Sequence, residues 1–191
     1  IDRGLDRAGV ASAAIVGVSF GGLIALRYAA TRPARTTSLV LVSTPAPAMT
    51  LSTEQARYVA YPRLALPMFA LRGAQRLAPE VWAAHETWVS RARAALAHSV
   101  HVASAPSSPV RMAAWVQAWR ETDLADDCRH VISPTLVITG EAGLDRVVPV
   151  ASTLEYVKLI AGARHVTLPR TGHMGLMLRP EAFAEAVSTF I

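Results

Sequence analysis

The feature that most constrains this chain is a glycine-flanked serine between two different hydrophobic patterns. Residues 13–18 form an apolar, strand-like run, residues 17–21 read Gly-Val-Ser-Phe-Gly, and an Ala- and Leu-rich helical pattern follows to Arg32. This order predicts a strand, a sharp turn and a helix, with Ser19 at the apex. A strained turn would hold the hydroxyl clear of a sheet. We expect side chains at Gly17 and Gly21 to clash where strand and helix crowd together.

The helix that begins after Ser19 adds an electrostatic element to the turn. Its first N–H groups and the positive end of its dipole would face the space above the serine. The amide of Phe20 is the first candidate donor to an oxyanion formed there. The alternative is a tight, glycine-rich turn that carries a passive serine.

The rest of the chain predicts an α/β fold with a parallel sheet of about four strands flanked by helices. Residues 38–43, 134–139 and 164–168 are short apolar runs typical of buried strands. The first of these runs follows the helix that ends before Pro33, so strand, helix and strand form a right-handed βαβ unit. A short helix over residues 1–8 should stop at Gly9.

Residues 45–129 interrupt this rhythm with helical patterns. One starts at Pro79 and aligns Val81, His85, Trp88, Ala92 and Leu96 on one stripe. A second opens with Ser108 and Pro109, a capping residue and a first-turn proline. An insertion of this length should be structured. We expect the tryptophans of this region to pack between its helices: Trp82, Trp88, Trp115 and Trp119.

Two further polar residues follow later strands and complement the serine. Asp145 comes after the strand at 134–139, and His173 comes after the strand at 164–168. The carboxyl ends of parallel strands meet at one edge, so these residues and Ser19 should lie close together. A serine nucleophile requires a base, and the base requires an orienting carboxylate. Glu141 is the rival acid, and Asp145 could instead cap a helix that begins near Pro149.

The Gly-x-Ser-x-Gly turn and the order Ser, Asp, His resemble the α/β-hydrolase superfamily. The resemblance implies a hydrolase core at residues 1–44 and 130–191 and a helical cap or lid at 45–129. It implies that Ser19 is the nucleophile, His173 the general base, Asp145 the orienting acid and Phe20 an oxyanion-hole amide. The implied activity is hydrolysis of a small carboxylic ester, lactone or thioester through an acyl-enzyme, with no cofactor. Asp145 lies five residues after Gly140, farther than is usual in the family.

Compared with a complete family member, about the first third is absent, including the loop that supplies the second oxyanion donor. The strand before Ser19 would also lose a neighbour and expose an apolar edge. We therefore expect the chain alone to be poorly soluble or weakly active. Two other functions stay open. One is an acyltransferase that uses the same triad, and the other is a non-catalytic, hydrolase-like module for ligand binding or regulation.

Composition argues against several other classes of function. The formal net charge is +5, but 18 of the 19 basic residues are arginines spread along the chain, which does not indicate nucleic-acid binding. The uncharged window between Arg7 and Arg27 contains the serine turn, which argues against a membrane span. The single cysteine, Cys128, suggests a reducing, cytoplasmic setting, and the scarcity of lysine suggests a bacterial source. Neither the pair His98 and His101 nor the run 128–130 has the partners of a metal site.

Overall fold

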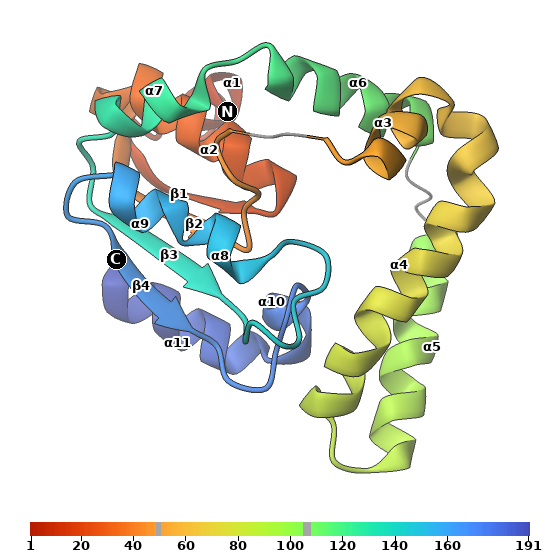
Figure 1. Cartoon of the computed structure of the whole chain (residues 1–191). Coiled ribbons are helices and arrows are strands. Elements are labelled where there is room, and N and C mark those ends of the chain that lie inside the picture. The colour runs from red at the N-terminus through yellow and green to blue at the C-terminus, as the bar shows by residue number, and fades with distance from the viewer. Residues whose placement is uncertain (49–50, 105–107) are drawn as a thin grey trace.

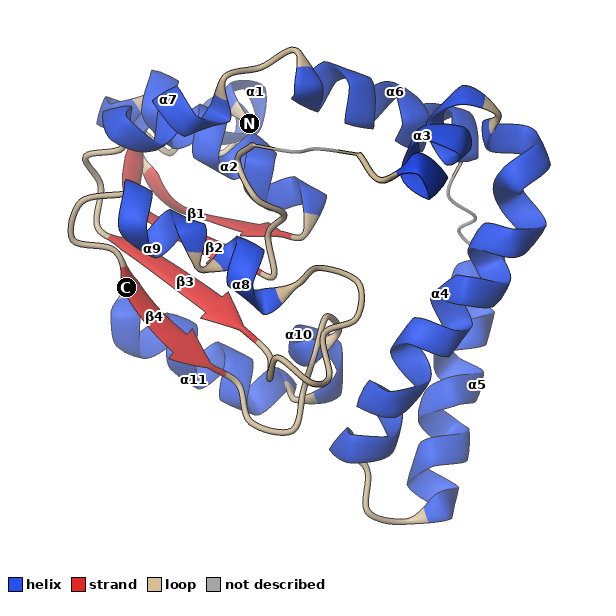
Figure 2. Ribbon diagram, in the orientation of Figure 1, coloured by secondary structure: helices blue, strands red, loops and turns tan. Residues whose placement is uncertain are grey.

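The computed structural model describes residues 1–48, 51–104 and 108–191. Within its helices, the side chains at 65–67, 69, 70, 74, 98 and 101–103 lie outside this description, so the metal-site question at His98 and His101 does too. The described residues contain four strands and the helices that surround them, as the sequence predicts (Figures 1 and 2).

The described strands form one parallel sheet in the order β1-β2-β3-β4. Their bounds are β1 Ala13–Val18, β2 Thr36–Val42, β3 Thr135–Thr139 and β4 Arg164–Thr167. At the carboxyl ends, Val18 pairs with Val42, and Val42 pairs with Ile138. The predicted α/β class with a parallel sheet is confirmed. The loops that leave all four strands therefore emerge at the same edge.

Helices cover both faces of the sheet. Their bounds are α1 Asp2–Arg7, α2 Phe20–Thr31, the 3-10 helix Pro33–Arg35, α3 Thr53–Ala60, α4 Pro62–Ala84, α5 Trp88–Ser104, α6 Pro109–Arg120, α7 Leu124–His130, α8 Val150–Thr153, α9 Glu155–Leu159, α10 Gly175–Leu178 and α11 Pro180–Phe190. No helix in the described part of the chain is long and apolar enough to cross a membrane.

Two hydrophobic cores lie on the two sides of the sheet. On one side, α2, α7 and α9 pack around Leu26, Leu39 and Tyr156, which are fully buried. On the other side, α11 packs with the partly buried Phe183 and Phe190 against Val40 and Ile138 (Figure 1). Strands β2 and β3 are thus buried on both faces, which explains their continuous apolar sequences.

The connection from β2 to β3 is helical, but the prediction of a helix that starts at Pro79 is wrong, because Pro79 lies inside α4. Instead of one helix from Pro79 through Leu96, α4 ends at Ala84 and α5 begins at Trp88, and the two helices run side by side (Figure 1). His85 is extended, with φ −116° and ψ 132°, and breaks the stripe. Helix α6 begins as predicted, and the Ser108 side chain accepts a hydrogen bond from the Arg111 N–H.

The tryptophans of this region behave differently from one another. Trp119 is buried and contacts the ring of Phe20 edge to face, whereas Trp115 is half-exposed and stacks on that ring. Trp82 and Trp88 are 63% and 76% exposed, so the expectation that they pack between helices is wrong. The break at 85–87 removes the shared stripe, and the guanidinium of Arg91 lies over the Trp82 ring instead.

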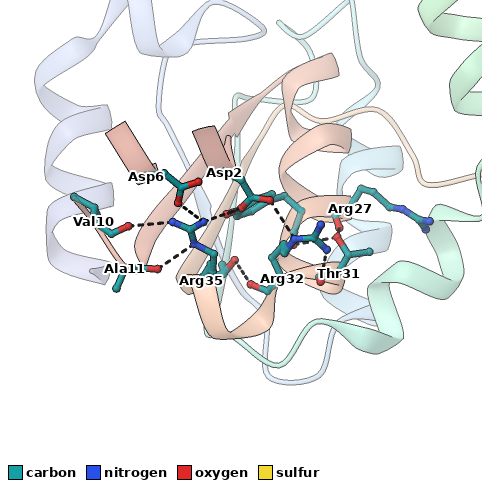
Figure 3. A network of polar contacts seen from close by, with 10 residues as sticks. Asp2, Asp6, Val10, Ala11, Arg27, Thr31, Arg32 and Arg35 are labelled. Atoms are coloured by element: carbon teal, nitrogen blue, oxygen red, sulfur yellow. Dashed lines mark hydrogen bonds and ion pairs between the residues drawn. The ribbon is translucent and has the colours of Figure 1, made fainter. Parts of the chain in front are cut away.

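A polar network fixes α1 to the core (Figure 3). The Asp2 carboxylate accepts hydrogen bonds from the Tyr28 hydroxyl at 2.7 Å and from Arg32 at 3.2 Å. Arg35 pairs with Asp6 at 2.8 Å and donates to the carbonyls of Val10 and Ala11. Helix α1 is followed by Gly9 with φ +66°, the left-handed stop that the sequence predicts.

Candidate active site

Ser19 occupies a strained turn between β1 and α2. Its φ of 51° and ψ of −127° lie in a region that residues with side chains seldom adopt. The Ser19 N–H donates to the carbonyl of Val42 at 2.8 Å, which ties the turn to the end of β2. Because the turn is anchored in this way, the serine is held at the carboxyl edge of the sheet.

Close packing at this turn depends on Gly17 and Gly22 rather than on Gly17 and Gly21. A Cβ on Gly17 would lie 2.6 Å from the Gly21 carbonyl oxygen, and one on Gly22 would overlap the side chain of Thr44. A Cβ on Gly21 meets no atom within 4 Å in the described part of the chain, so the expected clash at this position is wrong. The reason is the helical rotation, which turns Gly22 inward and Gly21 outward.

Two other glycines bring the loops after β3 and β4 into contact. A Cβ on Gly172 would lie 2.6 Å from the Leu144 carbonyl and 2.7 Å from the Asp145 nitrogen. On the other side, a Cβ on Gly140 would lie 2.5 Å from the Cα of Gly172. Only glycine allows this approach, which places His173 beside Asp145.

The structure brings Ser19, His173 and Asp145 into one chain of polar contacts. Nε2 of His173 lies 3.0 Å from Oγ of Ser19, and Nδ1 lies 3.4 Å from Oδ2 of Asp145. The second separation exceeds an ordinary hydrogen bond, and Nδ1 has no hydrogen-bond partner among the described residues.

Asp145 is held in place by backbone groups. Its side chain is 1% exposed, and Oδ1 accepts hydrogen bonds from the N–H groups of Val147 at 3.1 Å and Val148 at 2.8 Å. Oδ2 is thereby left facing the imidazole. The rival acid Glu141 is exposed, and its carboxylate accepts the Arg170 N–H at 2.7 Å. Of the two acids, Asp145 is the one in contact with His173.

Phe20 is the first residue of α2, so its N–H has no acceptor within the helix. It follows Ser19 directly and is available to an anion above the serine. The Phe20 ring is packed between α2 and α6, 5.6 Å from the Trp115 ring and 6.1 Å from the Trp119 ring. A serine hydroxyl in contact with an imidazole, at the start of a helix, is an arrangement that can attack an electrophilic carbonyl carbon.

One buried residue beside the site was missed by sequence reasoning. Glu80, on α4, is fully buried, and its Oε1 accepts the N–H of Met174 at 2.7 Å. Burial raises the pKa of Glu80, while hydrogen bonds from the backbone of Gly172 and Met174 oppose the shift. No local pattern marks this glutamate, because its role depends on where α4 lies relative to a loop 94 residues away.

The described residues hold no group of three His, Cys, Asp or Glu side chains placed to bind a metal ion. Cys128 is buried in the core beside α2, and burial raises the pKa of its thiol to about 12. A thiol in this state is a packing residue rather than a nucleophile.

Solved structures with the same fold are numerous. An esterase from Exiguobacterium antarcticum superposes with a TM-score of 0.76 at 20% identity, over 99% of this chain and 70% of that one. A hydrolase from Pseudomonas aeruginosa has a TM-score of 0.71 at 28% identity, over 98% and 68% of the two chains. An enol-lactonase from Burkholderia xenovorans superposes with a TM-score of 0.68 at 24% identity, over 97% of this chain and 68% of that one.

No functionally curated protein sequence matches the chain significantly. The family model described as alpha/beta hydrolase fold does match it, over residues 1–180. This match spans the serine turn and the loops that carry Asp145 and His173. The chain belongs to the alpha/beta hydrolase fold family.

Proposed function

We propose that this protein is a serine hydrolase of small carboxylic esters, lactones or thioesters that acts through an acyl-enzyme. The observation that carries the proposal is the 3.0 Å contact between Oγ of Ser19 and Nε2 of His173 at a strained strand-to-helix turn. The solved relatives named as an esterase and an enol-lactonase give independent support for ester and lactone substrates.

The reaction begins when Oγ of Ser19 attacks the carbonyl carbon of the ester and its proton passes to Nε2 of His173. The tetrahedral intermediate carries an oxyanion, which accepts the N–H of Phe20. Its collapse breaks the bond to the leaving oxygen or sulfur, and His173 returns the proton to that atom. The acyl group stays on Ser19.

The second half of the reaction regenerates the serine. Water gives a proton to His173 and attacks the acyl carbon, and the carboxylic acid leaves as Ser19 recovers its proton. Throughout both halves, Asp145 stabilises the imidazolium and fixes the ring so that Nε2 faces the serine. None of these steps uses a cofactor.

Residues 45–129 would act as the cap over this site, and residues 1–44 and 130–191 as the core. The half-exposed Trp115 stacks on Phe20, the residue that follows the nucleophile. An apolar surface at this point suits the acyl or leaving group of a substrate with few polar atoms.

Hydrolysis of p-nitrophenyl acetate tests the proposal. We expect Ser19→Ala to lower the enzyme-dependent rate by about a thousandfold or more, because the nucleophile is lost. Ser188→Ala is the matched control, since the hydroxyl of this exposed serine donates to the Glu185 carbonyl within α11. Equal rates for Ser19→Ala and wild type would contradict the proposal. A rate at background, together with no labelling of Ser19 by a fluorophosphonate in the folded wild-type protein, would favour a non-catalytic module.

The same assay separates hydrolysis from acyl transfer. Alcohols and amines added as acceptors compete with water for the acyl-enzyme. For a hydrolase, we expect the free acid to remain the main product. If the ester or amide of the acceptor predominates at millimolar concentrations, the protein is an acyltransferase with the same three residues.

A further inference from the structure

A buried carboxylate from the helical connection reaches the loop that carries the general base. Glu80 lies in the second-last turn of α4, and Figure 1 shows this end of the helix near α10. The residue has no exposed surface, and its Oε1 accepts the Met174 N–H at 2.7 Å. Met174 directly follows His173.

Glu80 interacts with the residues on both sides of His173, the proposed base. The N–H of Met174 donates to the carboxylate, and the backbone of Gly172, on the other side of His173, is close enough to stabilise its charge. Asp145 and His173 are also close enough to act on it electrostatically. No ion pair joins Glu80 to an arginine or lysine among the described residues, and its Oε2 has no hydrogen-bond partner there. Burying a carboxylate in this way is unfavourable, so the loop amides are its main compensation.

A second connection holds the same loop to the end of α4. Arg170, which adopts a left-handed φ of 61°, donates from Nε to the Ala83 carbonyl at 3.1 Å. Its Nη1 lies 3.0 Å from a carboxylate oxygen of Glu86. The last two turns of α4 therefore bond to the loop on both sides of Gly172, Ala83 to Arg170 and Glu80 to Met174.

We propose that Glu80 is a positioning residue that holds the backbone of residues 172–174 so that the His173 imidazole stays aligned between Ser19 and Asp145. This role rests on the proposed function of the site. Because Glu80 lies on α4, a shift of this helix would displace the backbone that carries the general base. Small displacements of a catalytic group lower rates strongly, so the loss of this hydrogen bond should appear in the chemical step rather than in binding.

The test uses the full chain and the rate of covalent inactivation by a fluorophosphonate, resolved into the half-saturating concentration and the maximal rate constant. Glu80→Met removes the acceptor with similar length and helix propensity. We expect it to lower the maximal rate constant by about ten- to a hundredfold and to leave the half-saturating concentration within about twofold. Glu80→Gln keeps an acceptor oxygen for Met174 and should stay within about threefold of wild type. Glu121→Gln, at an exposed carboxylate that follows α6, is the matched control.

Two results would overturn this role. One is a Glu80→Met variant that reacts as fast as wild type, and the other is a Glu80→Gln variant that is as slow as Glu80→Met. If Glu80→Met does not fold, amide hydrogen exchange of the wild-type protein decides: Met174 should be protected, and exchange at the unprotected rate contradicts the proposal. Failure of the wild type to react at all would overturn the proposed function and this role with it.

Discussion

Asp145 and Glu141 are two carboxylates in one loop with opposite environments. Asp145 is buried and faces His173, whereas Glu141 is exposed and bonds to the backbone of Arg170. We expect Asp145→Asn to lower the rate of ester hydrolysis by on the order of a hundredfold or more, because the imidazolium loses its counter-charge. The amide keeps an oxygen for Val147 and Val148, so the fold should survive.

Glu141→Gln is the control for this substitution and should leave the rate within about threefold of wild type, since only a surface contact changes. Steady-state kinetics together with thermal unfolding of both variants make the comparison. A larger loss in Glu141→Gln than in Asp145→Asn would assign the acid role to Glu141.

Gly22 and Gly21 are adjacent glycines that the structure treats differently. An alanine at Gly22 would overlap the fully buried Thr44, and we expect it to lower the free energy of unfolding by about 1–3 kcal/mol. An alanine at Gly21 meets nothing within 4 Å in the described chain and should be neutral or stabilising, because it favours the helix. Denaturant unfolding of both variants tests the pair, and equal destabilisation would contradict it.

Glu80 should make stability depend on pH in a defined direction. Burial raises its pKa in the folded state, so the folded protein holds this proton more tightly than the unfolded chain. The stability gained in this way is complete below the ordinary glutamate pKa of about 4.3 and is lost as pH rises toward the folded value. We therefore expect the melting temperature of wild type, relative to Glu80→Gln, to be higher at pH 4 than at pH 7. A difference that does not change with pH would contradict this.

At the scale of elements, strands were easier to predict than the helices of the connection. A parallel strand buried on both faces must be apolar throughout, so β2 and β3 can be predicted from their own sequences without knowledge of their neighbours. Nearly all described side chains of α4 and α5 are half-buried or exposed, and their apolar residues fit more than one register. The break at His85 depends on how the two helices pack against each other, and the local hydrophobic periodicity carries no information about that packing.

Helix α6 contributes to the core through one tryptophan. Trp119 is 6% exposed and packs against Phe20, whereas Trp88 on α5 is 76% exposed. We expect Trp119→Ala to cost about 3–5 kcal/mol of unfolding free energy, the usual loss for a buried aromatic. Trp88→Ala should change it by no more than about 0.5 kcal/mol. Thermal unfolding distinguishes them, and similar melting temperatures would show that α6 does not pack as described.

At the scale of the whole molecule, the parallel sheet explains why chain order predicts that the three residues of the proposed triad lie together. Ser19, Asp145 and His173 follow three strands that end at the same edge, so topology alone brings them together. Glu80 follows no strand. Its approach to Met174 depends on the length and direction of α4, which are properties of the folded connection. The sequence therefore predicts the residues of the chemistry better than the residues that support them.

The most direct test of the central claim is the site of covalent labelling by a fluorophosphonate. Trypsin should release residues 8–27 as one peptide, which contains Ser12 and Ser19, and fragment ions distinguish the two serines. We predict a single label on Ser19 that is lost in His173→Ala, because the hydroxyl reacts only when the imidazole 3.0 Å away accepts its proton. A folded protein that carries no label on Ser19, or carries it on Ser12 or Ser43 instead, would contradict the account.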